Sequence, residues 1–225
     1  NINGSWVQHV ATSVGRIKAD LYVITAGPWS RGLLERAEVK LPLKLYRCQV
    51  FTVKLPAEIE LPPGSDDVNN LYWAPESGKR VLLGNGRIEE VESVEKAIGS
   101  VKGSFVEEIA VKASKRIKGV LDAELVTGWS MPCSITPDGI PVVGKVHSLE
   151  NLYVATGLDG YGLMRGPAIG WLLAELIATG RTPNLLRAMS PNRFGEKSYG
   201  DFEIIERHSR LPFEITWFSQ SGRSK

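Results

Sequence analysis

The sequence predicts a mixed α/β and α+β fold, in which part of a doubly wound domain accompanies an antiparallel β-sheet with flanking helices. Two short apolar strands, at residues 21–24 and 151–156, each run into a loop of small residues that precedes a helix. This succession is typical of a doubly wound sheet. Between residues 41 and 127, several β-like segments separated by turn residues indicate antiparallel strands.

The composition is that of an ordinary globular protein. The 225 residues are 43% hydrophobic and 23% charged, with a net charge of +2. A chain of this length buries roughly 70% of the surface of its unfolded form, so it can build a sizeable core. The balanced charge disfavours a polyanion-binding class, and we expect no nucleic-acid partner.

The cysteine content and the hydropathy pattern set further limits. With only Cys48 and Cys133, the sequence has no disulfide framework and no structural zinc site, and it favours a reducing, cytoplasmic setting. We predict no metal site. The most apolar run, residues 168–179, is too short to span a bilayer and carries Glu175, so we expect no membrane span.

The first apolar strand leads into a candidate ligand loop. After a turn at Gly15-Arg16, residues 21–24 are expected to form a buried strand. At residues 25–30, small side chains permit a ligand to approach the backbone, and Pro28 stops the strand. A plain strand-to-helix turn is the alternative interpretation of these six residues.

The next segment predicts consecutive antiparallel strands. Residues 41–53 have a β pattern, and residues 56–67 form an irregular loop in this interpretation. The pair Gly78-Lys79 lies between two apolar runs, at 71–73 and 81–84, which is a hairpin pattern.

A charged helical segment follows. Over residues 89–118, apolar positions at helical spacing predict one or two amphipathic helices, interrupted near 99–103. Further strands are expected at 125–130 and 140–146, and a turn at residues 136–139 separates them.

Glycine is the unusual residue of this sequence. It accounts for 23 of 225 residues, about 10% where ~7% is usual. The strand at 151–156 runs into a glycine-rich loop, and we expect the helix after it to occupy 168–178, with Pro167 in the first turn. Such a loop presents unpaired N–H groups and about half a positive charge, which favour an anion. Its spacing, Gly157-x-x-Gly160-x-Gly162, is neither the dinucleotide fingerprint nor the phosphate-binding loop.

Three motifs together resemble a known family. They are Ala19-Asp20-x-x-Val23-x-x-Ala26-Gly27-x-Trp29-Ser30, Thr136-Pro137-Asp138-Gly139-x-Pro141-x-x-Gly144, and Asn151-Leu152-Tyr153-x-Ala155-x-Gly157-x-x-Gly160-x-Gly162 with Pro167-Ala168-x-Gly170. In order and spacing they resemble the FAD-dependent D-amino-acid oxidase superfamily, and more narrowly its branch of glycine oxidases, sarcosine oxidases and proline-type dehydrogenases. The likeness runs from about residue 17 to residue 194.

The resemblance implies a division of the chain. Residues 1–40 and 128–194 would form part of the FAD-binding domain, 41–127 the antiparallel substrate domain, and 195–225 a C-terminal extension. Members of the family open with a βαβ unit that carries Gly-x-Gly-x-x-Gly, a pattern that these residues do not contain. We therefore expect a C-terminal part, with the N-terminal FAD-binding half supplied by a longer polypeptide or by a companion subunit.

The resemblance also implies which residues contact the flavin. The candidates at the sheet edge are Ala26, Gly27 and Trp29. Along the pyrimidine side of the isoalloxazine ring they are Gly157, Asp159, Gly160, Tyr161, Gly162, Leu163 and Met164. In some relatives a cysteine attaches the flavin covalently, but Met131 stands at that position here, so non-covalent FAD is expected.

For the substrate, the resemblance points to Tyr72, whose equivalent lies over the flavin and touches the substrate carboxylate. A structural tyrosine packed in the sheet is the alternative. Tyr161 and Met164 stand where relatives have a histidine and a lysine. Tyr161 is therefore a second catalytic candidate. Recognition of the substrate carboxylate is then expected from Arg165 or Arg47. Cys133 falls where some relatives have an active-site tyrosine.

Other polar residues have structural interpretations. Asp138 is expected to cap its turn and not to act as a general acid or base. The three histidines, His9, His147 and His208, lie in no motif.

The activity implied is removal of a hydride from the carbon next to an amine nitrogen to flavin N5, with a small amino acid or amine as substrate and oxygen or another electron acceptor. The alternative is a non-catalytic docking or assembly subunit whose aromatic pair Trp217-Phe218 binds a partner. A folate-linked demethylating dehydrogenase would need a further large domain after Phe194.

Overall fold

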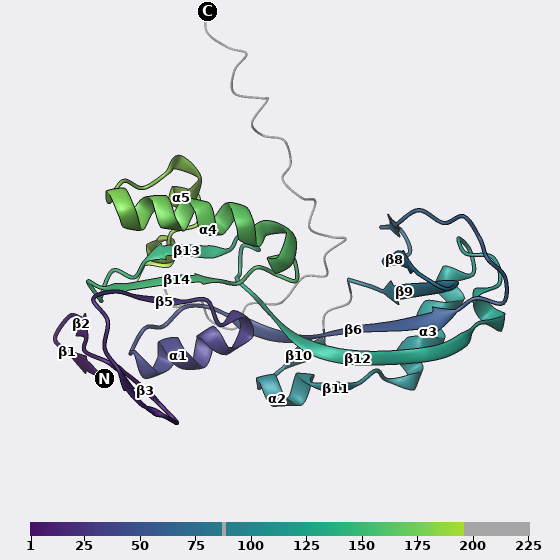
Figure 1. The fold of residues 1–225 in the computed structure, drawn as a ribbon, viewed down its shortest axis with the longest axis horizontal. Coiled ribbons are helices and arrows are strands. Elements are labelled where there is room, and N and C mark those ends of the chain that lie inside the picture. Colours follow the sequence, from purple (N-terminus) through teal and green to yellow (C-terminus); the bar gives the residue numbers. More distant parts are fainter. Residues whose placement is uncertain (87–88, 196–225) are drawn as a thin grey trace, which may run out of the picture. The chain divides into compact units, whose positions relative to one another are not determined.

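The structure is a computed structural model that describes residues 1–86 and 89–195, and its described residues divide into two compact units (Figure 1). Unit 1 comprises residues 1–48, 89–98 and 131–195, and unit 2 comprises residues 49–86 and 99–130. Two long strands, β6 (Lys44–Lys54) and β12 (Glu124–Ile135), contribute residues to both units. The assignment of FAD-binding and substrate domains stays a prediction.

Unit 1 is built on a three-stranded sheet in the order β13 (Val142–Lys145), β14 (Leu152–Thr156), β5 (Tyr22–Ile24). Strand β14 runs parallel to β5 and antiparallel to β13. Helix α4 (Gly162–Thr179) covers one face, and α1 (Ser30–Arg36) covers the other (Figure 1).

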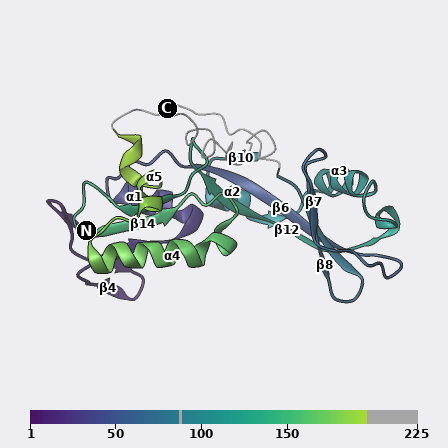
Figure 2. The same cartoon turned by 90° about the horizontal axis from the view of Figure 1, so that it is seen from above.

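Alternation along the central strands explains why both faces are covered. Val142 and Val154 pack with Leu34 of α1, whereas Val143 and Ala155 pack with Ile169, Leu173 and Leu176 of α4. Successive side chains of a strand point to opposite faces, so a strand that is apolar at every position needs a helix on each side. Figure 2 shows α4 running along β14. The doubly wound interpretation is confirmed for this unit.

Strand β5 differs from the expectation of a buried strand. Tyr22 and Ile24 are only partly buried, and Val23 is 41% exposed. The prediction was wrong because, within the described residues, β5 is the last strand of its sheet and pairs only with β14.

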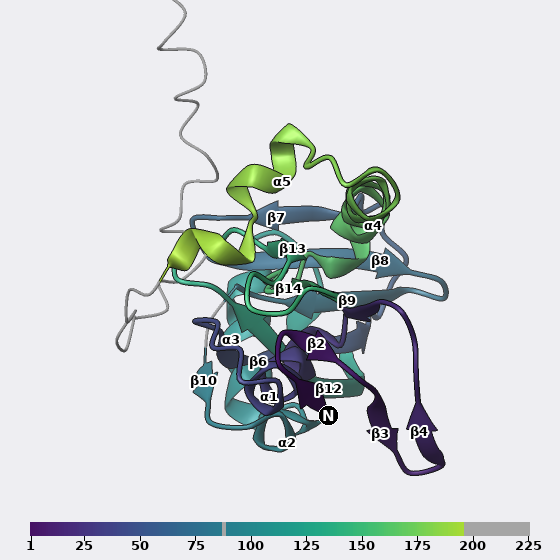
Figure 3. The same cartoon turned by 90° about the vertical axis from the view of Figure 1, so that its left-hand side faces the viewer.

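The N-terminal residues form two hairpins, β1 (Ile2–Asn3) with β2 (Trp6–Val7) and β3 (Val10–Thr12) with β4 (Gly15–Ile17). The β3–β4 hairpin projects from the rest of unit 1 (Figure 3). The turn expected at Gly15-Arg16 is therefore a strand. Residues 13–14 make the turn instead, where the Thr12 hydroxyl accepts a hydrogen bond from the Val14 N–H.

Short helical elements complete unit 1. The 3₁₀ turn η1 (Gly27–Trp29) leads into α1, while α5 (Asn184–Ala188) and η3 (Pro191–Phe194) follow α4. Helix α4 begins at Gly162, six residues before the expected start at 168. The Arg165 N–H donates to the Tyr161 carbonyl oxygen (3.0 Å), so the first turn is already helical there. Pro167 lies inside the helix and leaves the Leu163 carbonyl without its helical donor. Leu163 is 97% exposed, so this carbonyl belongs to a residue at the protein surface.

Unit 2 contains the antiparallel strands of the predicted hairpin region. Strand β9 (Arg80–Gly84) pairs with β6 and with β8 (Leu71–Glu76), and β7 (Gly64–Asp66) pairs with β8. The predicted hairpin at Gly78-Lys79 is confirmed, and both residues have positive φ (70° and 65°).

Helix α3 (Gly103–Ala113) covers this sheet, and the short turn η2 (Val120–Asp122) follows it. Phe105, Ile109 and Ala113 on one face of α3 are buried against Phe51 and Leu83. The rings of Phe51 and Phe105 meet edge to face, with centroids 6.1 Å apart. Aromatic contacts of this geometry contribute to core stability beyond the buried area.

The charged segment 89–118 is helical only in part. Residues Glu89–Val91 form β10, which pairs with β6, and α2 (Val94–Ala97) follows. Strand β11 (Gly99–Ser100) pairs with β12 at the predicted interruption. The helical prediction was wrong for 89–91 because cross-strand partners, such as Arg47 opposite Glu89, override weak local propensity.

Candidate functional site

A cavity of about 430 Å³ lies in unit 1. Its wall comes from the residues after β5, the end of β12, the loop after β14, and α4. The lining residues are Thr25, Gly27, Pro28, Pro132, Cys133, Ser134, Ala155, Leu158, Asp159, Gly160, Gly162, Gly166, Ile169, Gly170 and Leu173. The parallel strands β5 and β14 both end at this cavity, which is where open α/β sheets bind ligands.

The loop between β14 and α4 is fixed by hydrogen bonds to two other strands. Buried Asp159 adopts a positive φ of 53°, and its N–H donates to the Ser134 carbonyl oxygen of β12 (3.1 Å). Its Oδ1 accepts a 2.7 Å hydrogen bond from the hydroxyl of Tyr46 on β6. At the end of β14, the Thr156 hydroxyl donates to the Gly27 carbonyl oxygen (3.1 Å), which joins the two loops at the sheet edge.

The N-terminus of α4 opens on this cavity. Its N-cap, Tyr161, makes no side-chain capping hydrogen bond, and the first turn carries no acidic residue. The first N–H groups of a helix have no partner within the helix, and they carry about half a positive charge together with the aligned peptide dipoles. This end of the cavity therefore suits an anionic or electron-rich group.

One face of α4 is made of glycine. Gly162, Gly166 and Gly170 recur at every fourth residue and all line the cavity. A Cβ atom added at Gly166 or Gly170 would meet no atom within 4 Å, so side chains at these positions would occupy open space. The glycines leave room for a flat group to approach the helix backbone.

Comparison with known proteins places these features in a family. Residues 2–176 match the family model described as FAD dependent oxidoreductase. The chain belongs to this family. Its cofactor is FAD, and the cavity fits part of such a group, since it has an uncapped helix end for negative charge and a glycine face for a planar ring.

Three known proteins are similar to this chain. The 4-methylaminobutanoate oxidase (formaldehyde-forming) of Paenarthrobacter nicotinovorans is 28% identical over 79% of this chain and 22% of its own length. The glycine oxidase of Pseudomonas aeruginosa is 29% identical over 80% of this chain and 48% of its own length. The L-proline dehydrogenase of P. horikoshii has the same fold, with a TM-score of 0.77 and 23% identity over 86% of this chain and 52% of that one. The chain thus spans about half, or less, of these relatives.

The predicted flavin contacts separate into two groups. Gly27, Asp159, Gly160 and Gly162 line the cavity. The others, Ala26, Trp29, Gly157, Tyr161, Leu163 and Met164, are not among its lining residues.

Gly157 illustrates a structural role within the motif. It has a φ of 70°, and a Cβ there would lie 3.0 Å from Cγ2 of Thr136 and 3.3 Å from Cδ2 of Leu43. Glycine is therefore required at position 157 by the positive φ of the turn and by the close packing around it. Sequence reasoning missed Gly166 and Gly170 as cavity residues, although their spacing from Gly162 was a usable signal.

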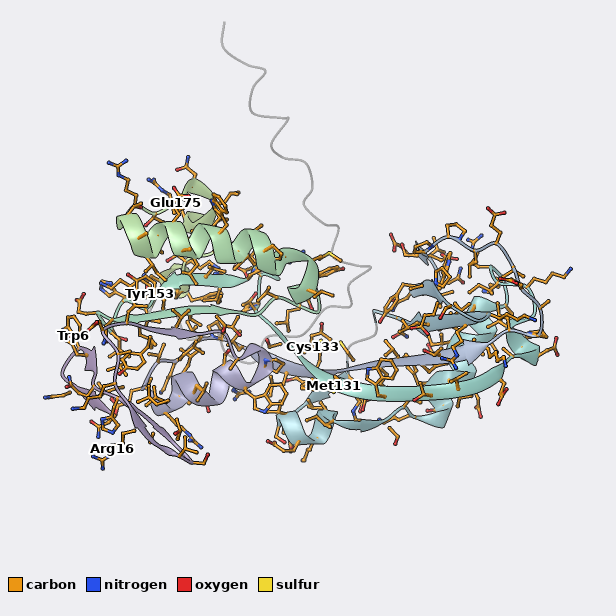
Figure 4. The ribbon with its side chains drawn as sticks, in the orientation of Figure 1. Trp6, Arg16, Met131, Cys133, Tyr153 and Glu175 are labelled. Atoms are coloured by element: carbon orange, nitrogen blue, oxygen red, sulfur yellow. The ribbon has the colours of Figure 1, made fainter. Side chains whose placement is uncertain are left out.

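The four candidate substrate residues occupy different surroundings. Cys133, whose side chain is labelled in Figure 4, is one of the lining residues of the cavity. The guanidinium of Arg165 lies 4.5 Å from the ring centre of Tyr161. Arg47 forms an ion pair with Glu89 (3.3 Å) and donates to the Lys96 carbonyl oxygen.

Tyr72, the fourth substrate candidate, belongs to unit 2. A Cβ added at Gly84 on the neighbouring strand would lie 2.4 Å from its ring and hydroxyl, so the ring packs directly on the Gly84 backbone. This contact agrees with the structural interpretation of Tyr72 and leaves a substrate role as a prediction.

Asp138 caps the turn before β13, as expected. Its Oδ1 accepts from the Ile140 N–H and from the Thr136 hydroxyl, and Arg193 donates to both carboxylate oxygens. Burial would raise the pKa of Asp138, but the hydrogen bonds from Arg193, Ile140 and Thr136 outweigh it and hold the pKa below its ordinary value.

The described residues contain neither a metal-ligating cluster nor a membrane-spanning helix. Within residues 1–86 and 89–195, no group of three or more His, Cys, Asp and Glu side chains is arranged to hold a metal ion. In the same residues, no helix has the length and apolar character needed to cross a membrane. His208 and the pair Trp217-Phe218 lie outside the described residues.

Proposed function

We propose that the cavity of unit 1 holds the flavin ring of non-covalently bound FAD, in a protein that oxidises the C–N bond of an amino acid or secondary amine. The observation that carries this proposal is the uncapped N-terminus of α4, which opens on a cavity with a glycine wall. When bound, FAD supplies the acceptor for the hydride that leaves the carbon next to the amine nitrogen.

The residues of this chain provide orientation and an electrostatic field. The N–H groups at the start of α4 stabilise negative charge that develops on a bound ring, by about 0.3–1 kcal/mol at an exposed helix end and by more at a buried one. Gly166 and Gly170 allow the ring to lie close to the helix. The hydrogen bond from Tyr46 to Asp159 holds the loop in place before the ring binds, so little ordering is needed on binding.

The substrate class follows from the named relatives. Glycine and 4-methylaminobutanoate each carry an amine and a carboxylate, so we propose a carboxylate-bearing amine as substrate. Among the two arginine candidates, Arg165 is favoured because Arg47 is already bonded to Glu89 and to the Lys96 carbonyl group. A guanidinium group matches a carboxylate with two parallel hydrogen bonds. Tyr72 and Tyr161 remain the proposed catalytic candidates.

The proposal includes partners outside this chain. The nucleotide half of FAD would be held by an N-terminal FAD-binding half or a companion subunit, and an electron acceptor would reoxidise the flavin. The cytoplasmic location expected from the cysteine content stays a prediction.

The test uses the complete protein in which this chain occurs. We expect flavin absorbance that acid precipitation releases into the supernatant, as non-covalent binding requires. We also expect reduction of a dye or consumption of oxygen with glycine, proline, N-methylglycine or 4-methylaminobutanoate. A colourless protein that binds no added FAD would reject the flavoenzyme and favour the docking subunit instead. A flavin that stays with the precipitated protein would contradict non-covalent binding of FAD, but it would not contradict the proposal of a flavoenzyme.

A further inference from the structure

Two cysteines meet beside the cavity, and one of them lines it. The Cys48 thiol on β6 lies 2.8 Å from the Cys133 sulfur on β12, measured between the Sγ atoms. Both residues are thiols, and both are partly exposed. Cys133 lines the cavity, so this residue can be approached from that space.

The placement suits a disulfide. A disulfide requires an S–S distance of about 2.05 Å and Cα atoms about 4.4–6.8 Å apart. Strands β6 and β12 are neighbours in their sheet, and the two Sγ atoms already lie 2.8 Å apart. The two sulfur atoms therefore need to move less than about 1 Å, which side-chain rotation can supply.

We propose that Cys48 and Cys133 form a reversible dithiol–disulfide pair, and that the pair is a reaction site for low-molecular-weight disulfides of the glutathione type that enter the cavity. The flavin ring proposed above would occupy the same cavity, so the reaction is assigned to protein without bound flavin. The chemistry itself uses only the two sulfur atoms and access to Cys133.

The reaction is a double thiol–disulfide exchange. The Cys133 thiolate attacks one sulfur of oxidised glutathione, a protein–glutathione S–S bond forms, and the glutathione S–S bond breaks with release of the first reduced glutathione. The Cys48 thiolate then attacks the Cys133 sulfur and displaces the second. In sum, two protein thiols lose two electrons and two protons, and one glutathione disulfide gains them as two thiols.

A different result is expected if the two cysteines serve only as small apolar side chains. Buried cysteines that serve as small apolar groups resist exchange. In a reactive pair at 2.8 Å, the second thiol displaces glutathione so quickly that the mixed disulfide does not accumulate.

The experiment treats the reduced protein, after any bound flavin has been removed, with oxidised glutathione and with the smaller disulfide cystamine, under denaturant-free conditions. Free thiols are then blocked, and intact mass and non-reducing peptide maps are recorded. We expect loss of two hydrogen atoms, a peptide cross-link between Cys48 and Cys133, and reversal by dithiothreitol. The oxidised form should unfold at a temperature higher by about 5 °C or more, because the bond closes a long loop of the unfolded chain.

Single substitutions provide matched controls. In C48S the mixed disulfide on Cys133 should persist, since no second thiol displaces it. In wild-type protein, persistence of the mixed disulfide, a cross-link between two molecules, or no reaction with either reagent would overturn the proposal. If C48S fails to fold, the wild-type peptide map still decides between these results.

Discussion

The hydroxyl of Tyr46 and the carboxylate of Asp159 are 113 positions apart in the sequence and are joined by a 2.7 Å hydrogen bond. Tyr46 is fully buried, and Asp159 is nearly so. Because the Asp159 N–H also donates to the Ser134 carbonyl oxygen, the loop before α4 is held by β6 and β12 together. The position of the helix end at the cavity therefore depends on these two contacts.

Replacing Tyr46 by phenylalanine tests this anchor. We expect Y46F to lower the free energy of unfolding by about 1–3 kcal/mol, because a buried carboxylate loses its hydroxyl donor while the ring still fills its space. Urea unfolding of the purified protein measures the change. Retention of FAD should fall in parallel, since the loop beside the cavity loosens.

The matched control for this variant is Y153F. Tyr153 on β14 is partly buried, and its hydroxyl has no hydrogen-bond partner in the described part of the chain. If Y46F is no less stable than Y153F, the hydrogen bond does not anchor the loop.

Local signals allowed much of the fold to be predicted. The hairpin at Gly78-Lys79 and the turn at residues 136–139 depend on residues that are adjacent in the sequence, and both occur in the structure as expected. The glycine loop before a helix was predicted for the same reason, although Gly162–Gly166 proved to be helical.

The parts that could not be predicted are contacts between distant residues. Tyr46 with Asp159, Cys48 with Cys133, and Arg193 with Asp138 are separated by 113, 85 and 55 positions. No propensity or turn pattern encodes such pairs, because they arise only when strands and loops from different segments are brought together. The same reason explains why β10 was mistaken for part of a helix, since its pairing with β6 is non-local.

The glycine face of α4 gives a test of the flavin proposal. We expect G170V to reduce the affinity for FAD at least tenfold, about 1.4 kcal/mol, because the side chain projects into the cavity. Titration of the apoprotein with FAD, followed by flavin fluorescence, measures the affinity. Gly170 is better suited than Gly160, whose φ of 74° would strain any valine at that position.

The control for this prediction is G32V on α1. Gly32 also has open space around its Cβ position and is not among the residues that line the cavity. In both variants valine replaces a glycine within a helix, so the change in helix propensity is similar in the two proteins. Equal FAD affinity in G170V and G32V would show that the flavin does not lie against α4.

Tyr72 provides a test of substrate recognition. In Y72F the ring still covers Gly84, so the stability should change by less than about 1 kcal/mol and FAD should remain bound. We expect kcat/KM for a carboxylate-bearing amine to fall tenfold or more if the hydroxyl contacts substrate, about 1.4 kcal/mol in transition-state stabilisation. Steady-state assays with a dye acceptor measure it. An unchanged kcat/KM would show that the Tyr72 hydroxyl does not contact the substrate and that the ring has only a packing role.

Asp66 gives unit 2 a predictable dependence on pH. The hydrogen bond from Arg116 (2.7 Å) is the largest of the effects that lower the pKa of Asp66 from 3.8 to about 2, and Asn69 adds hydrogen bonds from its side chain and its N–H. Because the folded state binds this proton more weakly than the unfolded state, the contribution to stability is fully present above about pH 4. It is lost as the pH falls from about 4 to about 2.

Thermal unfolding between pH 2 and pH 6 measures this effect. In D66N the fall in unfolding temperature below pH 4 should be smaller than in wild-type protein, because the titrating group has been removed, and the variant should already be less stable at pH 6. The neighbour Asp67 is exposed, so D67N is the control and should keep the wild-type profile. If D66N and D67N give the same pH profile, the ion pair with Arg116 does not stabilise the folded unit.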